Sequence, residues 1–148
     1  MKREIEYRGF DIRECRYGDL EYNRKDDEAR IHTYNEDGSY NKPYLVDPYT
    51  VGEFTGQYDK NDKKIYEGDI VRWDKDQKLY VVEFRSGMFY ASVEPCNPHI
   101  YGGFPLWFLC EEEQHCEIVG NRYVNPELLA TKQAWLSRLI CAENPCFV

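Results

Sequence analysis

The sequence contains no long apolar run and no targeting signal, and these absences exclude several classes of protein. No stretch approaches the roughly 20 consecutive apolar residues that an α-helix needs to span a bilayer, so we expect no membrane partner. Residues 1–4 run directly into alternating polar residues and lack the regions that define a signal peptide. We therefore expect a soluble, intracellular protein, in which disulfides are uncommon.

The cysteines and histidines lack the spacing of a zinc site. Of six cysteines and three histidines, Cys110, His115 and Cys116 lie close together in the sequence, with Cys141 and Cys146 further along. Structural zinc sites present thiolates in closely spaced pairs, because both sulfur atoms must reach one ion at about 2.3 Å, and none of these spacings matches. We interpret the cysteines as small buried apolar residues with one or two exposed thiols. The sequence thus predicts neither a metal nor another cofactor.

Motifs of catalysis are also missing. No nucleophile motif surrounds any cysteine, although nucleophilic catalysis needs a base and an orienting group beside the thiol. The glycines at 102–103 are followed by Pro105 and an expected strand, whereas a phosphate-binding loop leads into a helix. Glu67 and Asp69 flank Gly68, and we interpret Asp69 as a turn residue that binds backbone amides. We predict no catalytic residue and no enzyme activity; the alternative is an unrecognised hydrolase, because acidic residues and cysteines are plentiful.

Clusters of positive charge are absent as well. The chain has 19 Lys and Arg against 27 Asp and Glu, a formal net charge of −8, and basic residues alternate with acidic ones, as in residues 59–64. A protein that binds duplex DNA needs a cluster of Lys and Arg to displace counterions from phosphate. We therefore expect weak or no nonspecific DNA binding, unless a small basic patch forms in the fold.

Aromatic residues are abundant, with 13 Tyr, 7 Phe and 3 Trp, whereas Leu and Ile are sparse. Aromatic and β-branched side chains favour strands over helices. A chain of this size buries roughly 68–70% of its unfolded surface, enough for a real core. We predict a mainly β protein: an antiparallel sheet plus a small SH3-like barrel with one C-terminal α-helix. The expected parts are an N-terminal β region, 1–56, and the barrel with its helix, 57–148, which share a core or form one domain.

Short runs of alternating residues give the strands expected in the first part. They cover residues 4–10, 15–22 and 29–34, and the first two pair as a hairpin. Pro43 and Pro48 exclude a central paired strand because proline has no N–H to donate. We interpret that segment as an edge strand or an extended arm.

A compact meander of three strands predicts the barrel in the second part. The segments expected there are strands at 70–73, 79–84 and 88–93, a loop at 95–105, a strand apolar on both faces at 106–109, and a closing strand at 116–121.

Residues 54–73, FTGQYDKNDKKIYEGDIVRW, organise this second part. The two apolar runs 54–55 and 65–66 are separated by residues 59–62, which predict a reverse turn because Asn, Asp and Gly tolerate positive φ or bind their own backbone. A second turn at 67–69 leads into the strand 70–73. The residues that we single out for these turns and strands are Phe54, Thr55, Gly56, Asp59, Asn61, Tyr66, Glu67, Gly68 and Asp69.

Another turn motif leads into the expected helix. It consists of Gly120, Asn121, Asn125 and Pro126. Asn125 would supply the N-cap oxygen, Pro126 fits the first helical position and Glu127 complements the helix dipole. One broad face of the helix carries Leu128, Leu129, Trp135, Leu136, Leu139 and Ile140. From Trp135 onward, these residues are a candidate interface with a second copy of the chain; the alternative is that the helix covers its own barrel.

Four motifs together resemble the YopX family, whose members are mostly encoded by bacteriophages. Residues 54–71, FTGQYDKNDKKIYEGDIV, are similar to the family's FTGLKDKNGKEIYEGDIV, and residues 117–129, EIVGNRYVNPELL, are similar to its EVIGNIYENPELL. REI at 3–5 with YGDL at 17–20, and VDPYTVG at 46–52, match two further elements. Asp62 stands where the family favours Gly, and Gln57 where it favours Leu. Since Asp also adopts the left-handed conformation, we expect the turn to be kept.

The resemblance implies a β-rich fold with an SH3-like barrel, in a phage or prophage protein of the bacterial cytoplasm, and it implies no activity. Our leading hypothesis is a noncatalytic assembly or protein-interaction module that binds itself or another protein. The alternative is a small nucleic-acid-associated protein that uses a tyrosine-rich barrel face. Exposed tyrosines stack on single-stranded bases and also pack in protein interfaces, and the negative charge favours the protein partner.

Overall fold

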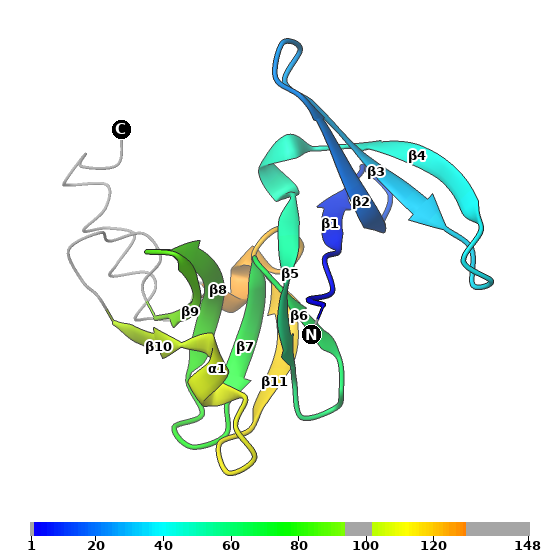
Figure 1. The fold of residues 1–148 in the computed structure, drawn as a ribbon. Helices are drawn as coiled ribbons and strands as arrows, with labels where there is room; N and C mark the ends of the chain where they lie inside the picture. The colour runs from blue at the N-terminus through cyan, green and yellow to red at the C-terminus, as the bar shows by residue number, and fades with distance from the viewer. Residues whose placement is uncertain (1, 94–101, 130–148) are drawn as a thin grey trace, which may run out of the picture. The chain divides into compact units, whose positions relative to one another are not determined.

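The computed structural model describes residues 2–93 and 102–129 and is built mostly of antiparallel strands (Figure 1). The chain divides into two compact units, Met1–Gly56 and Gln57–Val148. Each unit is described by itself. In the described residues no helix is both long enough and apolar enough to cross a membrane.

The first unit is an antiparallel sheet in the strand order β4-β3-β2-β1-β5. Its elements are β1 (Tyr7–Phe10), β2 (Cys15–Asn23), β3 (Glu28–Tyr34), β4 (Tyr40–Val46), the 3₁₀ turn η1 (Pro48–Thr50) and β5 (Gly52–Tyr58), whose last residues continue into the second unit. The three predicted strands and their hairpin are confirmed. Pro43 lies in β4 at the end of the sheet, as predicted for an edge strand.

Alternation along these strands places apolar side chains on one face of the sheet. Ile31 and Ala29 of β3 are fully buried with Val46 of β4, and Leu20 and Tyr7 pack against them. Burying a side chain of the size of Ile31 or Val46 stabilises the fold by roughly 1.5–3 kcal/mol. The opposite face of β2 and β3 carries mainly polar and charged residues, such as Asp19, Glu21 and His32.

The second unit contains a five-stranded antiparallel sheet in the order β10-β9-β8-β7-β11, and β6 is hydrogen-bonded to β5. Its elements are β6 (Lys64–Tyr66), β7 (Asp69–Trp73), β8 (Leu79–Arg85), β9 (Met88–Ser92), β10 (Gly103–Pro105), α1 (Leu106–Leu109), β11 (Cys116–Asn121) and the 3₁₀ turn η2 (Pro126–Leu129). The predicted meander and the strand at 116–121 are confirmed. β10 and β11 stand at the two ends of this sheet, and its closure into an SH3-like barrel is not confirmed.

Aromatic rings fill the core of the second unit. Trp73 contacts Phe104 and Phe108 with ring centroids 5.0 and 5.9 Å apart, and Tyr80 contacts Trp73 edge-on at 6.3 Å. Buried aliphatic residues such as Val71 and Val82 surround these rings. The aromatic composition of the sequence is thus used for packing, where edge-to-face ring pairs are favourable.

The apolar segment 106–109 is one turn of helix, so the strand predicted there is wrong. Leu106 and Leu109, three positions apart, are 1% and 0% exposed, whereas Trp107 between them is 48% exposed. A helical turn puts residues three apart on one face. Periodicity cannot distinguish a strand from a helix over only four apolar residues.

The loop predicted at 95–105 is only partly correct, because its last residues, Gly103–Pro105, form β10 against β9. Residues 94–101 lie outside the described part. At the C-terminal end, Pro126–Leu129 forms a 3₁₀ turn that begins at the predicted residue. The rest of the expected helix, with Trp135, Leu136, Leu139 and Ile140, lies outside the described residues. Within residues 4–93 the only helical segment is η1, as a mainly β fold requires.

Candidate functional site

Asp59 is a buried carboxylate that binds three backbone amides. It is 5% exposed, and its Oδ1 accepts hydrogen bonds from the amides of Asn61 and Lys63 at 2.9 and 3.0 Å. Its Oδ2 accepts from the amide of Ile118 in β11 at 3.0 Å. Bonds from amides to an ionised acceptor are among the stronger hydrogen bonds in proteins. Asp59 therefore shapes the turn between β5 and β6 and also fixes that turn to β11.

The turn itself has the geometry that the sequence predicted. Asp62 adopts φ of 59°, so the residue that replaces the family's Gly occupies the left-handed region that Asp tolerates. The amide of Asp62 donates to the carbonyl of Asp59 at 3.0 Å, and the amide of Lys60 donates to the carbonyl of Cys116 at 2.8 Å. The turn is closed by its own backbone and is attached to β11 at a second point.

Asp69 serves the second turn of the same motif. It is 2% exposed, and its Oδ2 accepts a hydrogen bond from the amide of Tyr66 at 2.8 Å. This bond confirms that Asp69 is a turn residue that binds the backbone. Gly68 lies between Glu67 and Asp69 with φ of 95°, and a Cβ atom there would stand 2.7 Å from Cε2 of Tyr123. Both the backbone and the neighbouring ring therefore require glycine at position 68.

The motif at the end of β11 forms a turn held by two asparagines. Oδ1 of Asn121 accepts from the amides of Tyr123 and Val124 at 3.1 and 2.8 Å. Oδ1 of Asn125, predicted to cap a helix, accepts from the amide of Asn121 at 3.2 Å, so it bonds back into the turn. A Cβ atom at Gly120 would lie 2.7 Å from that same oxygen.

The two sequence motifs contact each other in space. We call the residues of this contact the motif junction: Asp59, Gly68, Ile118, Arg122 and Tyr123. The Asp59 carboxylate bonds Ile118, the amide of Arg122 donates to the carbonyl of Gly68 at 2.9 Å, and the Tyr123 ring packs on Gly68. Sequence reasoning identified both motifs but gave no signal that they touch. The remaining predicted residues Phe54, Thr55 and Tyr66 are buried, and Gly56 has φ of 83°.

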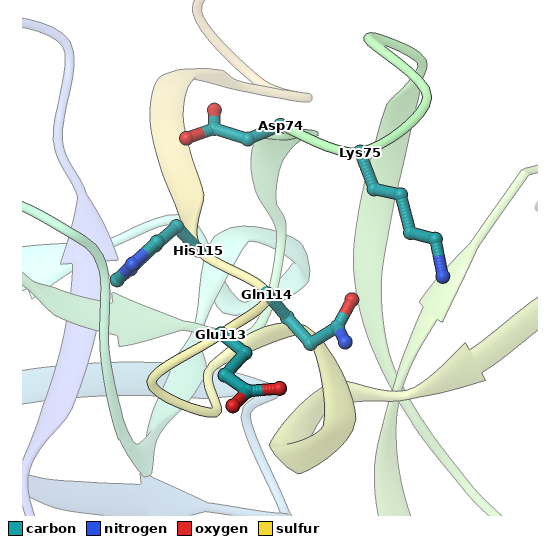
Figure 2. A pocket seen from close by; sticks show the side chains of 5 residues that line it. All are labelled: Asp74, Lys75, Glu113, Gln114 and His115. Atoms are coloured by element: carbon teal, nitrogen blue, oxygen red, sulfur yellow. The ribbon is translucent and has the colours of Figure 1, made fainter.

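A depression of about 380 Å³ in the second unit is lined by Asp74, Lys75, Glu113, Gln114 and His115. Figure 2 shows the Glu113 carboxylate, the His115 ring and the Lys75 ammonium pointing in different directions. In the part of the chain that the structure describes, no three His, Cys, Asp or Glu side chains are placed to hold a metal ion. The depression does not bring together the nucleophile, base and orienting group that a hydrolase needs.

Two of the cysteines that the sequence placed near His115 come together. Sγ of Cys110 lies 3.8 Å from Sγ of Cys116, and the His115 side chain is exposed. The hydrogen bond between the two sulfur atoms and burial raise the pKa of the Cys110 thiol, whereas the same hydrogen bond lowers the pKa of the Cys116 thiol. The remaining free thiol of the described residues is Cys15 in the first unit.

The first unit carries an exposed sheet surface, which we call the outer face. It is formed by the side of β2, β3 and β4 opposite the core: Tyr17, Asp19, Glu21, Arg30, His32, Tyr34, Tyr40, Pro43 and Leu45. Tyr17, Tyr34, Tyr40 and Leu45 are between 47% and 58% exposed. The tyrosines expected on a barrel thus occur mainly on this sheet.

Hydrogen bonds fix the rings of the outer face. His32 bonds Glu21 through Nε2 at 2.5 Å and Tyr40 through Nδ1 at 3.0 Å. The Tyr34 hydroxyl donates to Asp19 Oδ2 at 2.5 Å, which raises the pKa of Tyr34. The Tyr34 and Tyr40 rings meet edge-on, with centroids 5.9 Å apart. This network depends on the register of three strands, which the sequence does not give.

Comparison with known proteins gives a family and a distant structural neighbour. The model of the YopX protein family matches residues 6–130, and a search of curated proteins finds no match. A crystal structure of protein EF1440 from Enterococcus faecalis is similar over 86% of this chain and 99% of that chain, with 16% sequence identity and a TM-score of 0.47. The family match covers most of the sequence, including both motifs of the junction, and the chain belongs to the YopX family.

Proposed function

We propose that this protein is a noncatalytic interaction module and that the outer face of its first unit binds another protein. The observation that carries this proposal is the concentration of exposed rings on one ordered sheet surface: Tyr17, Tyr34 and Tyr40, with Leu45 beside them. Tyrosine is enriched in protein interfaces because its ring is large and apolar while its hydroxyl bonds polar groups. A surface of this kind on a small acidic protein is suited to partner recognition.

The rings of the outer face are also held in place before any partner arrives. Tyr34 is fixed by Asp19, and Tyr40 by His32, which Glu21 orients in turn. Binding costs conformational entropy for each side chain that becomes immobile. A surface whose rings are already ordered loses less of this entropy, which favours affinity.

The charge of the outer face indicates the chemistry of the partner. Asp19 and Glu21 lie on it, and the one guanidinium, that of Arg30, is paired with Glu28 at 3.0 Å. Complementary charge speeds association and excludes partners of the same sign. We therefore propose a partner that presents Lys or Arg side chains around an apolar centre.

The polar residues of the family motifs support a noncatalytic role. Asp59 and Asp69 are buried and bind backbone amides, and Asn121 does the same. Carboxylates used in this way stabilise turns and are not available for proton transfer to a substrate. Because the family includes mostly phage proteins, we propose that the interaction belongs to phage or prophage assembly.

The charge of the outer face argues against the nucleic-acid alternative. The exposed rings of Tyr34 and Tyr40 share their face with Asp19 and Glu21, whose charge repels a phosphate backbone. Stacking of bases would need these rings beside basic residues that follow the strand.

Immobilised full-length protein tests the proposal by capture of partners from a lysate of the bacterial host. We expect the wild type to retain a specific protein, identified by mass spectrometry and then titrated in purified form by calorimetry. The double variant Tyr34→Ala, Tyr40→Ala should weaken this purified interaction by at least tenfold, because interface tyrosines commonly contribute more than about 1 kcal/mol each.

Tyr49→Ala is the matched control, since Tyr49 is 84% exposed and lies in η1, outside the strands of the outer face. It should bind like the wild type. Equal affinity of the double variant and the wild type for the purified partner, with both folded by circular dichroism, would refute the role of the outer face.

A further inference from the structure

Cys110 and Cys116 form a close pair of thiols in the described part of the second unit. Cys110 follows α1 and Cys116 begins β11, and their sulfur atoms are 3.8 Å apart. A disulfide has an S–S bond of about 2.05 Å, so the two atoms must approach by less than about 2 Å to bond. Rotation of the side chains covers such a distance, since each sulfur pivots on its own Cα–Cβ bond.

The two thiols differ in access. Cys116 is 1% exposed and its carbonyl is bonded by Lys60, whereas Cys110 is only partly buried. An oxidant from solution therefore meets Cys110 first. Cys116 is positioned behind it to complete the reaction.

We propose that Cys110 and Cys116 are a redox-active dithiol, which a low-molecular-weight disulfide such as oxidised glutathione converts into an intramolecular disulfide. The Cys110 thiolate attacks one sulfur of oxidised glutathione, forms a mixed disulfide and releases one glutathione thiolate, which takes up a proton. Cys116 then loses its proton and attacks the Cys110 sulfur, which expels the second glutathione. In total, two protein thiols become one disulfide and one oxidised glutathione becomes two reduced molecules.

The new bond would close a small ring around the acidic loop 111–115. This loop contributes Glu113, Gln114 and His115 to the depression of Figure 2. Before oxidation the loop is joined by hydrogen bonds from Gln114 and His115 to the carbonyl of Glu111. After oxidation both ends of the loop would also be joined covalently, so the redox state would control how far the loop 111–115 can move.

The chemistry of Cys110 gives the oxidation a pH dependence. The hydrogen bond between its sulfur and that of Cys116, its partial burial and the charge of Asp59 all raise the pKa of the Cys110 thiol. Since the thiolate is the attacking form, only a small fraction of Cys110 reacts at neutral pH. The rate should rise with pH from 7 to 9, in proportion to the thiolate fraction.

The test is a disulfide map of the full chain after incubation with oxidised glutathione, with free thiols blocked by N-ethylmaleimide. Cleavage after Glu111, Glu112 and Glu113 separates the two cysteines, so a disulfide leaves the two peptides joined. We expect this joined species to form at least about tenfold faster than any disulfide that involves Cys15, because neighbouring thiols react as an intramolecular pair. Its rate should increase with pH.

Two variants give the controls. Cys116→Ser should stop the reaction at a glutathione adduct on Cys110, and Cys15→Ser should leave the disulfide unchanged. The wild-type map decides the matter even if a variant fails to fold. Two results would overturn the proposal. Either both thiols of the wild type still react with N-ethylmaleimide after prolonged oxidation, or Cys110 is joined to a different cysteine.

Discussion

Asp59, Asp69 and Asn121 accept hydrogen bonds from backbone N–H groups in turns of the chain. A buried N–H group without a partner costs about 1–3 kcal/mol, and turns create several such groups at once. Short acidic and amide side chains satisfy them because their oxygen atoms reach amides two to four residues away. The polar residues that make the sequence motifs recognisable are thus explained by the local folding of the backbone.

Asp59→Asn should destabilise the second unit by about 2–3 kcal/mol, since one amide acceptor is lost and an NH₂ group faces backbone donors. The measurement is the free energy of unfolding from urea titration. Asp62→Asn is the control, because Asn also tolerates the φ of 59° found there, and it should change stability by less than about 0.5 kcal/mol. Equal losses in both variants would show that the bond from Asp59 to β11 contributes nothing.

Gly68→Ala should cost at least about 2 kcal/mol, because a positive φ and a collision act together. The added Cβ would lie 2.7 Å from the Tyr123 ring at φ of 95°. Gly87 also has a positive φ, 81°, but nothing lies within 4 Å of its Cβ position, so Gly87→Ala should cost only about 1 kcal/mol. Thermal unfolding of the two variants measures the difference; if the losses are the same, the Tyr123 contact is unimportant.

The pKa of Asp11 predicts how the stability of the first unit depends on pH. The amides of Glu14 and Arg13 bind its carboxylate, Arg16 lies beside it, and its pKa falls to about 2 from the usual 3.8. Since the folded pKa is the lower one, this contribution to stability is present above pH 4 and is lost as the pH falls from about 4 to 2. NMR titration should give a midpoint near 2 for Asp11, and Asp11→Asn should flatten the stability profile in that window. A midpoint near 3.8 would contradict the observed geometry.

At the scale of elements, strands were predictable where residues alternate and where polar or charged segments bound them. Residues 15–22 and 29–34 have both signals, and β2 and β3 follow them within a residue or two at each end. The helical turn α1 was not predictable, because four consecutive apolar residues have no period. The bond between Asp59 and Ile118, 59 positions apart, was also beyond the sequence. It depends on how β11 pairs with β7, which no local pattern encodes.

The helical turn α1 predicts that replacing its buried side chains costs more stability than replacing its exposed one. Leu109 is 0% exposed, so Leu109→Ala should cost about 2–5 kcal/mol through the cavity that it leaves. Trp107 is 48% exposed, and Trp107→Ala should cost less than half as much, although the side chain removed is larger. Urea titration compares the two. A strand buried on both faces, as predicted from the sequence, would instead make Trp107→Ala at least as costly as Leu109→Ala.

At the scale of the whole molecule, charge and surface composition act together. The net charge of −8 keeps copies of the chain apart unless apolar contacts overcome the repulsion. The outer face offers such contacts in the first unit, with rings ordered by Asp19 and His32. The mutual hydrogen bonds of these residues follow from the register of β2, β3 and β4, which the sequence does not give. The proposed assembly would therefore depend on a few apolar surfaces, and a second such surface is predicted from the sequence alone.

That surface is the apolar set Trp135, Leu136, Leu139 and Ile140, which lies outside the described residues. Each side chain of this size gains roughly 1.5–3 kcal/mol when it is fully buried, so exposure of all four would be costly. We propose that they pack against a second copy and form a symmetric homo-oligomer, in which one patch meets its own equivalent. Sedimentation at micromolar concentration should show a species larger than 17.7 kDa. Trp135→Asp should return it to a monomer without change in the β-sheet signal of circular dichroism. A wild type that sediments as a monomer would mean that this set is covered within its own chain.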